Sequence, residues 1–245
     1  MKKFLHTIEK LIGVYRWHPK IALRYLPIVD FISQHHIGEG EVLEVGSGGL
    51  GIAPYLKKKV VGLDVVFAPP YYEQLMPVKG SITAIPFSDQ SFGAVVCTDV
   101  LEHIRPQDRE KAIEELIRVG EKIVCIGVPC GVQAQLQDEQ LETLYRKNHE
   151  TGYHFLDEQV EYGLPHEKEL IRWIKKAAEK FERSYSLVVT GNINLKLRKW
   201  LMMGWMTNSP MVNFFFRKIM IIAVPLLRLC NWEPTYRKIV VVTFK

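Results

Sequence analysis

The residues of this sequence that could bind a cofactor or take part in a reaction gather around one glycine-rich stretch. It holds Glu44, Gly46, Gly48 and Gly51, after an apolar run and before a stretch with helical spacing. Glycine lets the backbone turn sharply and lets a ligand approach closer than a Cβ atom would allow, and a helix start offers free N–H groups. Such a turn is suited to cradle a polar cofactor that carries a nucleoside.

The cofactor has to be chosen by other residues, because the three glycines also satisfy the Gly-x-Gly-x-x-Gly pattern of dinucleotide binders. Asp64 ends the next apolar run, where a carboxylate can accept hydrogen bonds from both ribose hydroxyls of NAD or of S-adenosylmethionine (SAM). Glu44 favours SAM, which has no phosphate and presents an ammonium and a sulfonium that a carboxylate attracts. A purely structural turn and a capping role for Asp64 are the alternatives.

The elements that must position these residues alternate along the chain from residue 41. Short apolar runs alternate with polar helical stretches, and this pattern is typical of strands and helices that wind a parallel sheet. Residues 130–165 are predicted to be a polar connection. The predicted helices cover residues 106–119 and 170–181, and the predicted strands cover residues 41–47, 60–67, 92–100, 122–129, 184–190 and 237–245.

Four runs between residues 41 and 130 resemble successive motifs of the class I SAM-dependent methyltransferases, in the group of small-molecule and ubiquinone-pathway methylases. They are VLEVGSGGLG, VVGLD, ITAIPFSDQSFGAVVCTDVLEHI and KIVCIGVP. The resemblance implies an α/β fold, with a Rossmann-like sheet of seven mostly parallel strands and an antiparallel last strand. N-terminal helices and a helical insertion before the final strand complete the expected fold.

The resemblance also implies roles for individual residues. The turn from Glu44 to Gly48 would hold the methionine end of SAM, Asp64 the ribose, and Val65 one side of the adenine. Ser81 stands where the family often has an acidic residue, and a serine accepts the adenine amino group more weakly. The implied cofactor-binding set is Glu44, Gly46, Ser47, Gly48, Asp64, Val65, Ser81, Ile82, Thr98 and Asp99.

Two residues are candidates for catalysis, His103 and Asp99. Methyl transfer from a sulfonium is an in-line displacement, so holding the acceptor close and collinear supplies most of the rate. A base is needed only when the acceptor must lose a proton. His103 follows the predicted strand at 92–100, on the edge where ligands of open α/β sheets bind, and a structural hydrogen bond to the following loop is the alternative.

Composition limits the partners and the compartment. The net charge of +5 is spread along the chain, so no nucleic-acid partner is expected. The four cysteines show no CxxC pairing, which predicts reduced thiols, no metal site and a cytoplasmic location. The N-terminus lacks the continuous apolar core of a signal peptide.

The chain divides into four parts on this interpretation. Helices are predicted at residues 3–16 and 20–36 of the lead-in. The parts are an N-terminal helical lead-in at 1–40, a SAM-binding Rossmann-like domain at 41–190, a helical insertion or lid at 191–236 and a final strand at 237–245.

The insertion carries aromatic and basic residues, which suggest a bulky small-molecule, sugar, lipid-linked or glycoconjugate acceptor; packing of a lid is the alternative. Its apolar runs at 200–216 and 219–227 are separated by Arg217 and Lys218, and neither is long enough to span a membrane. Peripheral membrane contact stays open. The oligomeric state is not predicted.

The predicted function is methyl transfer from SAM to an unidentified acceptor. Two other classes stay open. An NAD(P)-dependent oxidoreductase would use the same glycine turn and Asp64, although Glu44 argues against a pyrophosphate. A non-catalytic regulatory protein would bind SAM without turnover.

Overall fold

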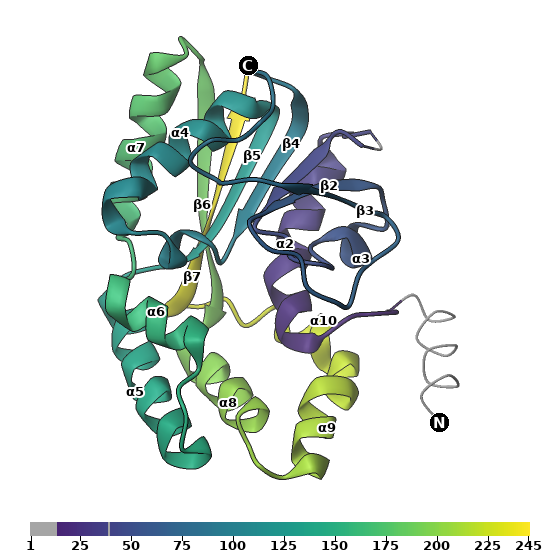
Figure 1. The fold of residues 1–245 in the computed structure, drawn as a ribbon, viewed down its shortest axis with the longest axis vertical. Helices are drawn as coiled ribbons and strands as arrows, with labels where there is room; N and C mark the ends of the chain where they lie inside the picture. Colours follow the sequence, from purple (N-terminus) through teal and green to yellow (C-terminus); the bar gives the residue numbers. More distant parts are fainter. Residues whose placement is uncertain (1–13, 39) are drawn as a thin grey trace.

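One mixed sheet organises the fold in the computed structural model, which describes residues 14–38 and 40–245. The strand order is β3-β2-β1-β4-β5-β7-β6 (Figure 1), and β7 runs antiparallel to both β5 and β6 while the other pairs are parallel. The predicted fold with an antiparallel last strand is therefore confirmed. The strands are β1 (Val42–Val45), β2 (Val60–Asp64), β3 (Leu75–Lys79), β4 (Phe92–Thr98), β5 (Gly120–Pro129), β6 (Tyr185–Asn194) and β7 (Thr235–Phe244).

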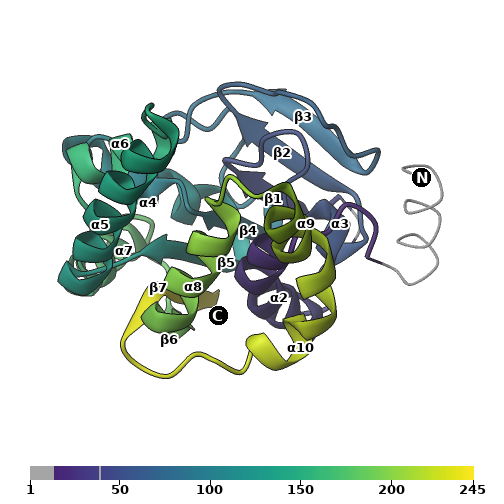
Figure 2. The ribbon, with the colours of Figure 1, turned by 90° about the horizontal axis from the view of Figure 1, so that it is seen from below.

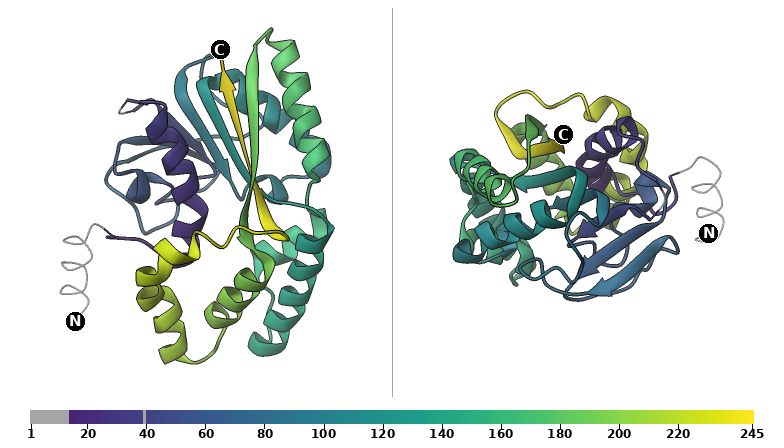
Figure 3. Two further views of the ribbon diagram at one scale, coloured as in Figure 1. Left: turned by 180° about the vertical axis from the view of Figure 1, so that it is seen from behind. Right: turned by 90° about the horizontal axis from the view of Figure 1, so that it is seen from above.

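Helices cover both faces of the sheet. The central strands are therefore buried on both sides, and their sequences are continuous apolar runs. Successive residues of β1 point to opposite faces, with Val42 in one core cluster and Leu43 in the other. The first cluster includes residues of α2 (Pro19–Gln34) and α3 (Ala53–Leu56), and the view from behind in Figure 3 shows α2 on that side. The second includes residues of α4 (Arg109–Val119) and α7 (Glu167–Lys180).

The predicted helix at 20–36 corresponds to α2, which contains Pro27. The predicted helix at 3–16 lies outside the described residues except for its last three. The helix predicted to follow the glycine turn is a single turn, α3. Its free N–H groups therefore add less to the site than the sequence suggested.

Two regions of the fold were missed. The edge strand β3 was not among the predicted strands, because Pro77 interrupts its short pattern and only an edge strand tolerates proline. The predicted polar connection at 130–165 is wrong, since it contains the helices α5 (Val132–His149) and α6 (His154–Tyr162). Few residues of either helix are buried, so the apolar spacing that reveals a helix is weak there.

The helical insertion between β6 and β7 is present and consists of α8 (Leu195–Trp205), α9 (Pro210–Lys218), the 3-10 turn η3 (Ile219–Ala223) and α10 (Val224–Leu227). We call residues 195–232 the cap. Figure 1 shows the cap at the end of the molecule opposite the C-terminus, and Figure 2 views the molecule from the end where the cap lies. The strand β7 ends at the C-terminus, away from the cap, and the parallel strands run in the opposite direction to β7. The carboxyl ends of the parallel strands therefore lie beside the cap.

The structure corrects one prediction about the cap. Arg217 and Lys218 do not separate its two apolar runs, because α9, η3 and α10 follow one another directly. The combined stretch Pro210–Leu227 has 18 residues and a mean hydropathy of 1.6, so it is long and apolar enough to cross a membrane by length and composition alone. Only 11% of it is buried in the protein.

Candidate functional site

The glycine turn after β1 has a conformation that other residues fit poorly. Gly46 has a φ of 80°, and a Cβ atom there would overlap the side chain of Val100. Gly51 has a φ of 53°, and a Cβ atom there would overlap the carboxylate of Glu44. Positive φ and close approach together require glycine at both positions. The turn is therefore built to bring backbone close to its neighbours.

Glu44 lies behind this turn and is fully buried in β1. Its Oε2 accepts a hydrogen bond of 2.6 Å from the Ile52 backbone N–H, which closes the turn, whereas its Oε1 has no hydrogen-bond partner. Burial raises the pKa of Glu44, although the hydroxyl of Tyr25 and the Ile52 N–H oppose this shift. The geometry gives Glu44 a structural role, and its predicted contact with the methionine end of SAM stays a prediction.

Asp64 joins the turn to the end of β2. Its Oδ2 accepts a hydrogen bond of 2.8 Å from the Gly48 N–H, and its Oδ1 accepts one of 3.2 Å from the Val66 N–H. Val65, which lies between Asp64 and Val66 in the sequence, is 58% exposed. A carboxylate held at the strand end beside an exposed apolar side chain suits a ribose with its base alongside.

Three other predicted site residues have side chains that are buried or already hydrogen-bonded within the protein. The Ser81 hydroxyl already makes a hydrogen bond of 2.9 Å with the Thr83 hydroxyl. Ile82 is buried in the core cluster that contains Leu63. Ser47 is also buried and donates a hydrogen bond of 3.1 Å to the Gly48 carbonyl. These three side chains support the walls of the predicted site.

Asp99 follows β4 with a φ of 52° and binds two arginines that the sequence analysis missed. Arg237 donates from Nε to Oδ1 and from Nη2 to Oδ2, both at 2.5 Å, and Arg24 donates from Nη1 to Oδ2 at 3.1 Å. Burial opposes ionisation, but the charges of Arg237 and Arg24 overcome it and hold the pKa of Asp99 well below its usual range. Asp99 is therefore a fixed anion and is unsuited to act as a base.

His103 lies in the 3-10 turn η1 (Leu101–His103) and is oriented by α6. Its Nδ1 lies 2.8 Å from Oε2 of Glu158, and the Phe155 ring packs edge-on against the imidazole. Burial lowers the pKa of His103, although the carboxylate of Glu158 opposes this shift. With Nδ1–H donated to Glu158, Nε2 is the unprotonated nitrogen, which is the form that a general base requires, and the side-chain amide of Gln159 lies 3.4 Å from it.

A group of cations lies between the sheet and the cap. Lys20 Nζ contacts Met202 Sδ at 3.6 Å and lies 4.7 Å from the centre of the Trp205 ring. Burial and the charge of Arg198 lower the pKa of Lys20 to about 8. Arg198 itself binds Asp138 of α5 at 2.6 Å. We call the four cations Lys20, Arg24, Arg198 and Arg237 the cation cluster.

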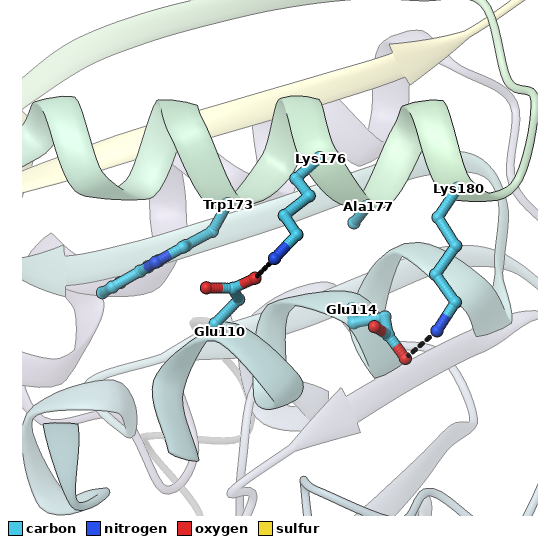
Figure 4. Close-up of a pocket in the computed structure, with 6 residues that line it drawn as sticks. All are labelled: Glu110, Glu114, Trp173, Lys176, Ala177 and Lys180. Carbon is cyan, nitrogen blue, oxygen red and sulfur yellow. Dashed lines mark hydrogen bonds and ion pairs between the residues drawn. The ribbon is translucent and has the colours of Figure 1, made fainter. Parts of the chain in front are cut away.

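A groove between α4 and α7 lies apart from these residues (Figure 4). Its ion pairs join Lys176 to Glu110 at 2.5 Å and Lys180 to Glu114 at 2.9 Å. None of the predicted site residues lines this groove. Its lining is a set of surface ion pairs and offers no arrangement for catalysis.

Comparisons with known proteins agree with the fold. Residues 43–122 match the family model described as a methyltransferase domain. A chain in the Haloferax volcanii complex that contains the Trm112 methyltransferase activator is 12% identical, with a TM-score of 0.52, over 90% of this chain and 89% of that one. The cyclase SpnF is 13% identical, with a TM-score of 0.50, over 89% of this chain and 80% of that one. No curated protein matches the sequence at a significant level.

Residues 43–122 therefore match a methyltransferase domain, and SAM is the cofactor of the class I SAM-dependent methyltransferases that the motifs resemble. The residues present fit that cofactor. Two buried polar atoms, Oε1 of Glu44 and Oγ1 of Thr98, lack hydrogen-bond partners, and both belong to strands that end at the glycine turn or beside it. A ligand with an ammonium or hydroxyl donor would satisfy such atoms.

Proposed function

We propose that the protein transfers a methyl group from SAM to an acceptor that carries an anionic group. The observation that supports this proposal is the charge balance between the sheet and the cap. The cation cluster has four positive side chains, whereas the carboxylates bonded to them are Asp99 and Asp138. Burial and the charge of Asp99 raise the pKa of Glu102 well above its usual range, and burial raises the pKa of Glu44, so both carboxyls are less able than Asp99 to offset the cluster.

An excess of positive charge in a partly desolvated site is costly unless a ligand compensates it. The cluster is compact, since Arg24 and Arg237 share Oδ2 of Asp99. Arg198 and Arg237 also lie 3.5 and 5.5 Å from the centre of the Tyr236 ring. A phosphate or carboxylate is the ligand that closely spaced arginines and a lysine bind best.

Bound SAM would supply an electrophilic methyl group, whose carbon would form a bond to the acceptor atom as its bond to the sulfonium breaks, with a neutral thioether as the leaving group. The chain's own residues bind and orient the two reactants. The turn at Gly46 and the carboxylate of Asp64 position the donor, and the cation cluster anchors the acceptor at the same carboxyl edge. Where the acceptor atom carries a proton, Nε2 of His103 would receive it in place of its long contact of 3.4 Å with the side-chain amide of Gln159.

The two alternatives differ in what they bind and turn over. A carboxylate at position 44 disfavours the oxidoreductase, because the strand before the glycine turn of a dinucleotide site is usually apolar next to the pyrophosphate. A SAM-binding protein without methyl transfer is the stronger alternative, because the cyclase SpnF shares the fold and the fold alone does not determine the reaction.

Calorimetry with SAM and with NAD tests the donor side, and tight binding of NAD without SAM would contradict the proposal. The acceptor side is tested with tritiated SAM and pairs of acceptors that differ only in a phosphate or a carboxylate. We expect label in the charged member of a pair. The variant Lys20→Met should raise the KM of that acceptor roughly tenfold, the loss of one charge-assisted hydrogen bond, at an unchanged Kd for SAM.

The matched control is Lys175→Met, which removes an exposed lysine of α7 and should change neither constant. Equal labelling of charged and neutral acceptors would overturn the anionic group while leaving methyl transfer intact. No labelling of any acceptor, together with firm SAM binding, would favour the regulatory protein.

A further inference from the structure

A stripe of large apolar side chains follows the outer face of the cap. The stripe consists of Met211, Phe215, Ile219, Ile222, Leu226 and Leu229. Their spacing of three or four residues is that of one helix face, and all six are exposed, with Met211 at 80% and Ile222 at 79%. A helix on a soluble surface normally shows the opposite pattern, with its polar face toward water.

The inner face of the same stretch is anchored, so the stripe does not result from an undocked helix. Met220 and Val224 are buried in the core cluster that includes α2. Phe216 packs against Trp200 with ring centres 4.8 Å apart and lies directly on the backbone of Gly204, where a Cβ atom would overlap it. The cap therefore presents its apolar stripe to the outside while its other side holds it in place.

Charge identifies the kind of surface that fits this stripe. The cap, residues 195–232, contains six lysines and arginines and no aspartate or glutamate. Lys196, Lys199 and Arg217 are exposed on it. Arg228 of the cap pairs with Asp30 of α2, and the exposed cations of the cap, together with the apolar side chains, complement the interface of a bilayer with anionic lipids. A second copy of the chain fits less well, because a symmetric contact places these cations opposite one another.

We propose that the cap docks on an anionic membrane surface, with the stripe inserted at the level of the headgroups. The stretch lies on the bilayer and does not cross it. Its 18 residues include Pro210, Asn213, Arg217, Lys218 and Pro225, and its residues Met220 and Val224 are buried in the protein core.

Docking in this orientation gives the site access to molecules held in the membrane. The cap lies at the carboxyl edge of the sheet, and Lys20 of the cation cluster touches its α8. An acceptor with an anionic head and an apolar tail would reach the cation cluster from the lipid side. This consequence for the acceptor rests on the proposed function, whereas membrane docking does not.

Flotation with vesicles tests the proposal without any need for activity. The full-length protein is mixed with vesicles of phosphatidylcholine alone or with about 30% phosphatidylglycerol. We expect flotation with the anionic vesicles, at least tenfold more than with the neutral ones, and a decrease at high salt. The fluorescence of Trp200 and Trp232, both exposed, should shift to shorter wavelength on binding.

The variants Ile222→Glu and Leu226→Glu should each reduce binding at least tenfold. The matched control is Val188→Glu, because Val188 is 49% exposed on β6, away from the cap, and should leave binding unchanged. Circular dichroism verifies that each variant is folded, and the fluorescence shift tests the unmodified protein independently.

Three results would overturn the proposal. They are no flotation with either vesicle, flotation that Ile222→Glu and Leu226→Glu leave unchanged, and a stable dimer that no longer binds vesicles. Resistance to extraction by alkaline carbonate would instead show that the stretch crosses the bilayer. Each result is independent of methyl transfer, so it does not depend on the outcome of the acceptor tests.

Discussion

The backbone N–H of Gly48 and the carboxylate of Asp64 are 2.8 Å apart, so the glycine turn after β1 is bonded to the end of β2. The other oxygen of Asp64 accepts from Val66. One carboxylate thus fixes two backbone segments and still has lone pairs for further donors, because an ionised carboxylate offers about four acceptor sites. This bond links the integrity of the turn to the predicted ribose contact.

Asp64→Ala should weaken SAM binding by about 1.5–3 kcal/mol, the value of charge-assisted hydrogen bonds to the ribose, which corresponds to roughly tenfold to a hundredfold in Kd. Calorimetric titration with SAM measures it. Asp89→Ala is the control, since Asp89 is an exposed carboxylate bonded to Arg118 and far along the chain from the turn. An unchanged Kd in Asp64→Ala would show that the ribose binds elsewhere.

Gly46→Ala should destabilise the fold and abolish SAM binding, because the new methyl group overlaps Val100 in addition to the cost of a positive φ. The backbone cost is about 1–2 kcal/mol and the overlap adds about 1–3 kcal/mol. Gly40→Ala isolates the first contribution, since Gly40 has a φ of 76° with no atom near its Cβ position. Urea unfolding compares the two variants, and equal losses of stability would contradict the predicted overlap.

A pH profile distinguishes a base at His103 from a structural histidine. Burial keeps the pKa of His103 below 6.5, and the Glu158 carboxylate raises it. Glu158→Gln should therefore lower the pKa of His103 and move the acid limb of kcat against pH to lower pH. The control is Glu161→Gln, an exposed residue of the same helix α6. Identical acid limbs in the protein and in Glu158→Gln would remove His103 from the proton transfer.

The donor side of the site could be predicted from the sequence because its residues lie in contiguous motifs. The turn at Gly46 and the carboxylate of Asp64 are both set by strands that end beside them. The acceptor side of the site could not be predicted from the sequence, since Arg24, Arg198 and Arg237 come from α2, α8 and β7 and meet only in the folded chain. Their partner Asp138 lies on α5, a helix too polar to be recognised by apolar spacing.

The same limit explains His103. The sequence predicted His103 at the carboxyl edge of the sheet, and the structure has it there. Its partner Glu158 comes from α6, a helix that was predicted to be a connection. A long-range pair of side chains leaves no periodic signal in a single sequence. The apolar stripe of the cap was obscured in a different way, because Arg217 and Lys218 interrupt the apolar pattern of the sequence without interrupting the succession of helical turns.

The pair of Asp99 and Arg237 should be one of the strongest polar contributions to stability. Arg237 is 8% exposed and donates two hydrogen bonds to Asp99, so Arg237→Leu leaves a partly buried carboxylate with Arg24 alone. Removal of one partner of a buried pair costs about 3–5 kcal/mol. Urea unfolding of Arg237→Leu, Asp99→Asn and the double variant measures the coupling. Additive losses would show that the two side chains do not act as a pair.

The same variant carries a test in pH. The pKa of Asp99 is depressed in the folded protein, so its contribution to stability is present above the unfolded value of 3.8 and is lost as the pH falls toward the folded value. Without Arg237 the pKa of Asp99 is lowered less, so the ionised Asp99 contributes less to the free energy of unfolding and less is lost in acid. The difference in the free energy of unfolding between the protein and Arg237→Leu should therefore narrow as the pH falls from about 5 to about 3. A constant difference would mean that Arg237 contributes through packing on Tyr236 and not through the charge of Asp99.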